Sequence, residues 1–273
     1  MTVYVLGALN VDLVTRVPHH PAPGETILGH SDGRFAGGKG GNQAMAARRA
    51  GAEVVMVGCV GDDELGWAYI SRLQDAGIDA DQVDATTAGP TGTALITVSD
   101  DGENSIIVIP GANESASVPA GFVSGEVLLA SLEVPLSVVA ETARAAHEAG
   151  VRVVLNLAPY ADLPADVIAL ADPVIVNETE AAQLTDAGLR PASVVTTLGS
   201  QGATWTRGSG EVAREPGIDV RRVVDSTGAG DAFCGALAAA LAGGLGDADA
   251  LREANAAGAQ AVSWQGAQPD GAI

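Results

Sequence analysis

The sequence predicts an α/β fold, with a mostly parallel central sheet flanked by helices and a small β-lid. Short apolar, β-rich runs recur along the 273 residues with amphipathic stretches between them. This alternation is typical of parallel strands joined by helices. Two segments, about 13–36 and 92–109, break the alternation and are typical of short hairpins. We therefore expect a single domain spanning residues 1–273, in which these two segments form the lid.

The individual elements follow from local patterns. The β-rich runs expected in the central sheet are residues 3–7, 53–58, 127–132, 151–156, 173–177 and 193–197. Helices are expected at 42–50, 65–76 and 136–149, and the run 231–241 is apolar nearly all round, which predicts a buried helix. In the second lid segment, Asp100-Asp101-Gly102 marks a hairpin turn. We expect neither lid segment to belong in the parallel sheet.

Charge and composition exclude several classes of partner. The net charge of −20 argues against DNA, RNA and anionic membranes. No apolar stretch approaches the roughly 20 residues of a membrane helix, and residues 2–7 are typical of a first strand and not of a signal peptide. The two cysteines, Cys59 and Cys234, lie in apolar runs and are expected to be buried thiols in a reducing cytoplasm.

A glycine turn near the C-terminus carries the clearest chemical signal. The small residues Gly228, Ala229 and Gly230 precede the apolar run, which places a tight turn at a buried helix N-terminus. Free N–H groups and the helix dipole make such a terminus an anion site. Asp231, expected to begin the helix, could be only an N-cap. A carboxylate beside an anion hole also suits phosphoryl transfer, as the base that accepts a hydroxyl proton. The dinucleotide fingerprint and the P-loop pattern are both absent.

A second glycine run, residues 36–44, precedes a helix near the N-terminus. It contains Lys39, the only lysine among 14 basic residues, and arginine cannot copy its compact charge. Asn42 offers donors and acceptors to sugar hydroxyls. Asp12 follows the first strand, at the edge where ligands of parallel sheets gather. Taken alone, the run could be a flexible connection, and Asp12 could cap its own turn.

The two glycine stretches, about 190 residues apart, resemble the two signature motifs of the ribokinase-like (PfkB) carbohydrate kinases. The resemblance extends from Gly7 to Asp270 and includes the segments 10–12, 23–26, 61–66, 177–180 and 266–269. It implies ATP-dependent phosphorylation of a sugar in the cytoplasm, and Lys39 in the first motif favours the 5-hydroxyl of D-ribose. Deoxyribose, fructose and adenosine are alternative acceptors. A catalytically silent sugar- or nucleotide-binding regulator is a further alternative.

The resemblance also implies roles for individual residues. Asp231 would be the general base, and Gly228, Ala229 and Gly230 would form the anion hole. The residues that would line the sugar site are Asn10, Asp12, Gly38, Lys39, Gly40, Gly41, Asn42, Glu133 and Asp231. Those that would bind ATP or organise its Mg²⁺ are Asn177, Glu180, Thr197, Gly199, Ser200, Gly202, Gly230 and Asn255. The ligands of a potassium ion, several acting through backbone carbonyls, would be Asp225, Thr227, Ala261, Trp264, Gly266 and Asp270.

Simpler interpretations exist for some of these positions. Glu133 could be a solvent-facing residue at a strand end, and Asn177 with Glu180 could be an ordinary helix start. The sequence also departs from the family: residues 180–193 have room for only one short helix, and Asp270 stands where serine is usual. The chain ends soon after this position, without the usual closing helix. Pairing of two lids into a homodimer would be one way to cover their strand edges.

Overall fold

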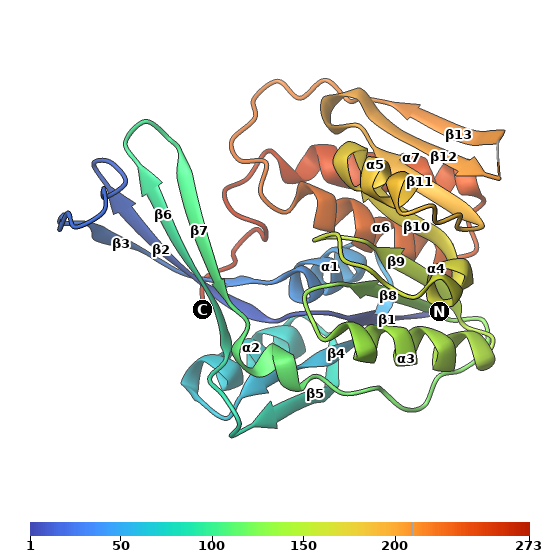
Figure 1. Cartoon of the computed structure of the whole chain (residues 1–273), viewed down its shortest axis with the longest axis horizontal. Helices are drawn as coiled ribbons and strands as arrows, with labels where there is room; N and C mark the ends of the chain where they lie inside the picture. The colour runs from blue at the N-terminus through green and yellow to red at the C-terminus, as the bar shows by residue number, and fades with distance from the viewer. Residues whose placement is uncertain (209) are drawn as a thin grey trace.

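Two sheets organise the computed structural model, which describes residues 1–208 and 210–273 (Figure 1). Across these residues the larger sheet has nine strands in the order β13-β12-β11-β10-β9-β8-β1-β4-β5. Every pairing from β11 to β5 is parallel, and β12 and β13 add antiparallel strands at one edge. The bounds are β1 Thr2–Leu6, β4 Glu53–Gly61, β5 Asp79–Thr86, β8 Val127–Ser131, β9 Arg152–Asn156, β10 Ala171–Asn177, β11 Ser193–Thr197, β12 Gly202–Arg207 and β13 Gly210–Pro216. The predicted parallel α/β sheet is confirmed.

Helices cover both faces of this sheet, and a separate hydrophobic core fills each side. One core involves α1 Lys39–Arg49, α2 Glu64–Asp75, α6 Ala229–Ala242 and α7 Asp247–Ala261. The other involves α3 Leu136–Glu148, α4 Ala165–Leu170 and α5 Glu178–Asp186. α6 is buried along nearly its whole length, as its apolar sequence predicts. None of the helices in the described ranges is long and apolar enough to cross a membrane.

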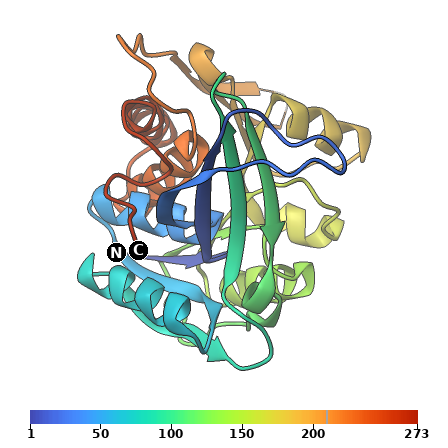
Figure 2. The same cartoon turned by 90° about the vertical axis from the view of Figure 1, so that its left-hand side faces the viewer.

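The smaller sheet is the lid, which projects from the body beside the C-terminus (Figures 1 and 2). Its strands are β2 Asn10–Val17, β3 His30–Gly37, β6 Gly92–Ser99 and β7 Asn104–Ile109, in the order β3-β2-β6-β7. The two expected hairpins form, and neither segment joins the parallel sheet of the body, as expected. Within the lid, however, β2 and β6 pair in parallel. β2 and β6 both leave the body at the lid base, where Asn10 lies opposite Gly92, and they run outward side by side.

Two helices begin elsewhere than the sequence suggests. α1 begins at Lys39 and not at residue 42, because Gly38 supplies the turn at φ 81° and the following glycines are helical. α6 begins at Ala229, after Gly228 at φ 76°. Asp231 therefore lies in the first turn of α6 and does not begin it. At both helices a glycine with positive φ is the N-cap, so the N-cap residue has no side chain with which to cap the helix.

The glycines of α1 allow a close approach to the rest of the body. A Cβ on Gly40 would overlap the backbone of Gly7, and a Cβ on Gly41 would overlap the hydroxyl of Tyr69. Tyr69 is fully buried, and its hydroxyl donates to the carbonyl of Gly37 at 2.6 Å. The start of α1 is therefore held against both β1 and α2.

We predict that Gly41→Ala destabilises the protein although it improves helix propensity. Alanine would add about 1 kcal/mol of helix propensity. Displacing Tyr69 would cost about 1–3 kcal/mol through overpacking and about 1 kcal/mol through its hydrogen bond. The free energy of unfolding, measured in urea, should fall by about 2 kcal/mol. The control is Gly89→Ala, whose Cβ makes only ordinary contacts; equal stability of the two variants would contradict the packing argument.

Candidate active site

The candidate site lies where the lid joins the body, at the carboxyl ends of the parallel strands. Asn10 follows β1, Glu133 follows β8, and Asn177 and Thr197 end β10 and β11. Because these strands are parallel, their carboxyl ends meet at one edge, where ligands of such sheets bind. α1 and α6 pack against each other and begin near this edge, so both glycine stretches converge there.

The N-terminus of α6 has the properties of an anion site. The first N–H groups of a helix have no partners within the helix, and here no side chain caps them. A Cβ on Gly230 would meet nothing within 4 Å among the described residues. Space is therefore available beside these N–H groups. The first N–H group of α1 differs, because that of Lys39 donates to Glu133 Oε2 at 2.8 Å.

Asp231 is held by two amide side chains from α1. Its carboxylate is 7% exposed. Asn42 Nδ2 donates to Oδ2 at 3.0 Å, and Gln43 Nε2 donates to Oδ1 at 2.9 Å. The interpretation of Asp231 as merely an N-cap is wrong, since Gly228 occupies that position. A carboxylate oxygen can accept more than one hydrogen bond, so each oxygen keeps the capacity to accept a further proton.

Charged groups gather around Asp231. Burial alone would lower the pKa of Lys39, but the negative charges of Asp231 and Glu133 outweigh it and raise the pKa, so the ammonium stays protonated. Burial raises the pKa of Glu133, and the N–H of Lys39 opposes that rise. Burial, together with repulsion by Glu133, raises the pKa of Asp12 to about 7. Glu133 is thus a site residue rather than a solvent-facing strand end.

Asn113 is a residue that the sequence analysis missed. It lies in the 3₁₀ turn Gly111–Ser115 after β7, and its Oδ1 accepts from the N–H of Leu9 at 2.8 Å. Its Nδ2 donates to Asn10 Oδ1 at 2.8 Å and to the carbonyl of Pro110 at 2.9 Å. These bonds fix the lid base to the end of β1. An isolated asparagine whose partners at the end of β1 lie more than 100 residues away leaves no local pattern in the sequence.

The residues expected to bind nucleotide lie along the same sheet edge and continue onto α7. Asn177 and Glu180 form a capping box at α5, with Glu180 N–H to Asn177 Oδ1 at 2.9 Å and Asn177 N–H to Glu180 Oε2 at 2.8 Å. The ordinary helix-start interpretation of this pair is therefore correct, although Glu180 also raises the pKa of Lys39 and so acts on the site. Thr197 ends β11, and Gly199 and Ser200 form a 3₁₀ turn before Gly202. Asn255 donates to the carbonyl of Pro216 at 2.9 Å.

Most of the expected cation ligands lie in two chain segments, residues 225–227 and 261–266, that hydrogen bonds hold together as one loop region. Asp225 Oδ1 accepts from Thr227 N–H at 2.9 Å and Oγ1 at 2.7 Å, and Asp225 Oδ2 accepts from Gly266 N–H at 3.0 Å. The N–H of Trp264 contacts the carbonyl of Ala261 at 3.4 Å. Asp270 is engaged differently, because its carbonyl accepts from Arg72 Nη1 at 2.8 Å. Carbonyl oxygens suit a hard cation.

A metal held by side chains alone finds no support in the described ranges. They contain no cluster of three or more His, Cys, Asp or Glu side chains placed to hold an ion.

The glycines Gly40 and Gly41, expected to line the sugar site, are buried and pack against Gly7 and Tyr69. Gly38 lies at the N-terminus of α1, where a Cβ would overlap the backbone of Ala8 and Asn10.

We predict that Asp12→Asn changes the pH dependence of stability. The folded protein holds the proton of Asp12 up to about pH 7, whereas the unfolded chain releases it near its ordinary pKa of 3.8. Stability therefore falls as the pH rises through this window. Asparagine carries no charge, so the variant should gain up to about 4 kcal/mol relative to wild type at pH 8 and nothing at pH 4.

Urea unfolding at several pH values measures this difference. Asp100→Asn is the control, because Asp100 is exposed in the turn between β6 and β7. Parallel stability curves for Asp12→Asn and wild type would show that the buried carboxyl does not titrate in this window.

Comparison with known proteins assigns the chain and its fold to a family. The model of the pfkB family carbohydrate kinases matches residues 2–272. A ribokinase of Bacillus subtilis is 39% identical, with 97% of this chain and 94% of the relative aligned. A ribokinase of Schizosaccharomyces pombe is 37% identical, with 98% and 93% aligned. The structure of Arabidopsis thaliana ribokinase complexed with ribose and ATP superposes with a TM-score of 0.87 at 30% identity, covering 97% of this chain and 93% of that one. The chain belongs to the pfkB family of carbohydrate kinases.

Proposed function

We propose that this protein is an ATP-dependent ribose kinase that phosphorylates the 5-hydroxyl of D-ribose. The observation that carries the proposal is the position of Asp231. Its carboxylate lies in the first turn of α6, beside N–H groups that no side chain caps. The charge of Asp231 raises the pKa values of both Lys39 and Glu133, so the three charged groups interact with one another. The ribokinase relatives extend over nearly the whole chain.

In the proposed reaction Asp231 accepts the proton of the sugar hydroxyl, which then attacks the terminal phosphoryl group of ATP. The N–H groups at Gly228, Ala229 and Gly230 would neutralise charge on the transferring phosphoryl. Positioning and charge neutralisation are the main tasks of a protein in this chemistry. Mg²⁺ bound with ATP would offset phosphate charge, and Asn177 and Glu180 are proposed to organise it through water.

Asp12, Asn42 and Glu133 are proposed to bind the sugar. Carboxylates accept hydrogen bonds from sugar hydroxyls. Hydroxyl donors favour the charged form of a carboxyl group, so bound ribose would lower the pKa of Asp12 from its raised value of about 7. Asn10 is proposed to shape this site, and its amide oxygen is already occupied by Asn113.

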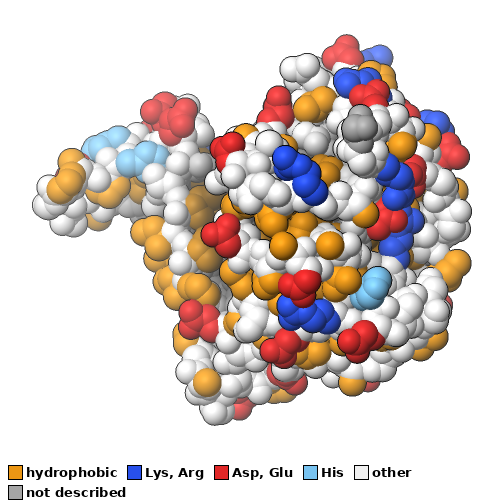
Figure 3. Space-filling view, turned by 45° about the vertical axis from the view of Figure 1, so that its right-hand side comes forward, with side chains coloured by type: hydrophobic (Ala, Val, Ile, Leu, Met, Phe, Trp, Pro, Cys, Tyr) orange, Lys and Arg blue, Asp and Glu red, His pale blue; other side chains and the backbone are white. Residues whose placement is uncertain are grey.

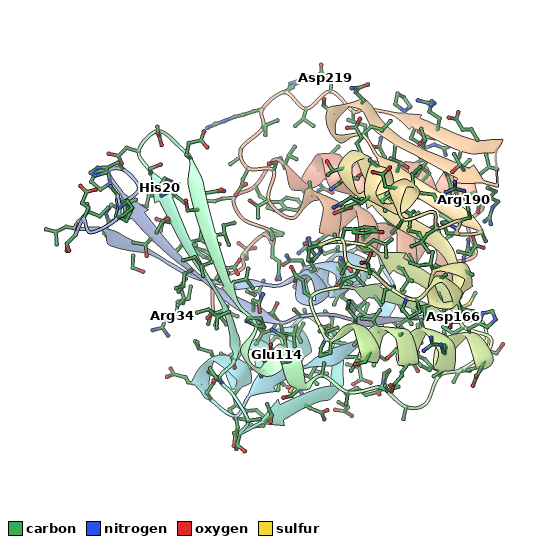
Figure 4. All side chains as sticks on the ribbon, viewed as in Figure 1. His20, Arg34, Glu114, Asp166, Arg190 and Asp219 are labelled. Carbon is green, nitrogen blue, oxygen red and sulfur yellow. The ribbon has the colours of Figure 1, made fainter. Side chains whose placement is uncertain are left out.

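The test is ADP release over a panel of ribose, deoxyribose, fructose and adenosine. We predict that ribose gives the highest kcat/KM and that Asp231→Asn lowers kcat by at least about 10²–10⁴-fold, the usual contribution of a general base. Asp166→Asn is the control, because Asp166 lies on α4 away from the lid and pairs with Arg144 (Figure 4).

Three outcomes would count against the proposal. Unchanged ribose turnover in Asp231→Asn would remove the base. A preference for another acceptor would correct the substrate. Absence of turnover on every compound would favour the catalytically silent sugar- or nucleotide-binding regulator.

We also propose that potassium activates the enzyme by binding in the loop of Asp225, Thr227, Ala261, Trp264 and Gly266. Asp225 and Thr227 directly precede the N-terminus of α6 in the chain. The segment that contains Gly266 packs against this terminus, since a Cβ on Gly228 would overlap the neighbouring Ala267. A cation there would strengthen the positive potential at the anion site. Replacing K⁺ by choline at constant ionic strength should lower kcat, and Asp225→Asn should abolish the difference. Equal rates in both salts would exclude this activation.

A homodimer through the lid is proposed from its exposed edge strand. Every residue of β7 is exposed, including Ile106 at 52%, Ile107 at 62% and Val108 at 53%. Apolar side chains gather along the projecting lid in Figure 3, and unpaired strand edges readily pair with another chain.

We predict that Ile107→Asp lowers the sedimentation-derived mass from dimer to monomer. Val123→Asp, at a position outside the lid that is 59% exposed, should leave it unchanged. A wild-type protein that sediments only as a monomer at micromolar concentration would contradict the proposed dimer.

The cytoplasm is the proposed compartment. The proposal rests on the need for ATP and on Cys59 and Cys234, which are both buried and unpaired in the described structure. The charge of −20 supports small-molecule ligands rather than nucleic acid or membrane.

A further inference from the structure

A chain of hydrogen-bonded side chains runs from the surface to Asp231. Arg72 of α2 donates to Gln268 Oε1 from Nη2 at 3.2 Å and from Nε at 3.4 Å. Gln268 Nε2 donates to Asn42 Oδ1 at 2.9 Å, and Asn42 Nδ2 donates to Asp231 Oδ2 at 3.0 Å. Arg72 is half-buried, whereas Gln268, Asn42 and Asp231 are 3%, 8% and 7% exposed.

The two ends of this chain give it a single direction. A guanidinium group has only donors, and an ionised carboxylate has only acceptors. Each amide between them has an oxygen at one side and an NH₂ group at the other. Only one orientation of Gln268 and Asn42 satisfies all the contacts. If both amides turned over, an NH₂ group would face Arg72 and a carbonyl oxygen would face Asp231.

We propose that Arg72 is a positioning residue that fixes the orientation of Gln268 and Asn42, so that Asp231 always receives an N–H donor and stays ready to accept a proton. This inference rests on the proposed role of Asp231 as the base. Arg72 does not touch the carboxylate. Its guanidinium acts through two buried amides, which have little alternative solvation and therefore transmit its donor character.

Gln43 donates a hydrogen bond to Asp231 even though this leaves another polar atom of Gln43 without a partner. Gln43 is fully buried and donates to Asp231 Oδ1 at 2.9 Å, yet its own Oε1 has no hydrogen-bond partner within the described structure. A buried acceptor without a partner is unfavourable. The arrangement places an N–H on each oxygen of Asp231 and leaves the unmet acceptor on Gln43.

Several titratable groups face Asp231 from the surrounding elements, and any test must leave them unchanged. They are Lys39 from α1, Tyr69 from α2, Glu133 after β8 and Cys234 from α6. Substitution at Arg72 keeps all four side chains in place, and of the four it acts on Tyr69, whose pKa the charge of Arg72 lowers against the larger effect of burial. Measuring kcat at saturating ribose reports the titration of the enzyme–substrate complex, with ribose already on Asp12.

The experiment compares three substitutions at one position on the same folded enzyme. Arg72→Lys keeps a donor-only group, Arg72→Met provides neither donor nor acceptor, and Arg72→Glu provides acceptors only and should reverse the two amides. Arg48→Glu is the matched charge control, because among the described residues the side chain of Arg48 donates its hydrogen bonds to the carbonyls of Ala76 and Ala52.

We expect Arg72→Lys and Arg48→Glu to retain the acid limb of the wild-type profile of kcat against pH. Arg72→Glu should move this limb up by about one pH unit and so lower kcat about tenfold at pH values on the limb itself, which corresponds to the loss of a hydrogen bond to a charged group. Arg72→Met should lie between them. Raising the ionic strength should not restore Arg72→Glu, because salt screens distant charge but does not reorient an amide.

The outcomes separate this inference from the proposed function. Ribose turnover by the wild type that Asp231→Asn abolishes establishes the function independently of Arg72. Given that result, identical profiles for Arg72→Glu and Arg72→Lys would overturn the inference. So would a lower melting temperature without a moved limb, since Arg72 also binds the carbonyl of Asp270 and would then be only a structural tether. If Arg72→Glu does not fold, Gln268→Glu against Gln268→Met repeats the comparison, because glutamate cannot donate to Asn42.

Discussion

The close packing of α1 against α6 is the contact on which the whole site depends. A Cβ on Gly235 of α6 would overlap the carbonyl of Gln43 and the backbone of Ala47. Because Gly235 has none, the two helices approach closely enough for amides of α1 to reach a carboxylate of α6 that is 188 to 189 residues away in sequence. Gly41 presses the same end of α1 against Tyr69. The glycines of both motifs thus serve packing as much as ligand access.

The same contact explains how an acidic protein can offer a site for a polyphosphate. The chain carries a net charge of −20, but salt screens the charges that lie farther from the site than a Debye length of about 8 Å. Within the site, the uncapped terminus of α6 and the ammonium of Lys39 supply positive potential in a partly buried setting. Local charges in such a setting are screened less than distant ones. Burial raises the pKa values of the nearby acids Asp12 and Glu133.

Sequence patterns predicted the elements in which apolar residues recur with the spacing of a strand or of a helix. The parallel strands and the helices at 65–76 and 136–149 were predicted to within a few residues because burial imposes a repeat on each. β5, β12, β13 and α7 were missed; polar residues are interleaved in these strands, and α7 has alanines on several faces. The parallel pairing of β2 with β6 depends on where two hairpins leave the body, which no local pattern records.

Some residues of the candidate site could likewise be predicted from local sequence, and others could not. Asp231, Lys39 and Asn42 stood out because glycine turns surround them, whereas the expectation that Asp231 begins its helix failed because Gly228 takes the N-cap. Gln43, Gln268, Arg72 and Asn113 could not be identified, since each acts through a partner distant in sequence. An amide in a glycine run is only a weak signal until the structure shows the acidic group that it faces.

The unfavourable features of this protein are concentrated where the ligands are expected to bind. Asp12 is partly buried without a cation at hydrogen-bonding distance in the described structure, Gln43 keeps an unmet acceptor, and α6 begins without a side-chain cap. The features of Asp12 and α6 would be relieved by different parts of the reacting pair, since hydroxyl donors suit Asp12 and phosphate oxygens suit the N–H groups of α6. The body, by contrast, is packed with two continuous apolar cores. The stability that these two cores provide allows the edge of the sheet to keep polar groups whose interactions are completed by a ligand and not by the fold.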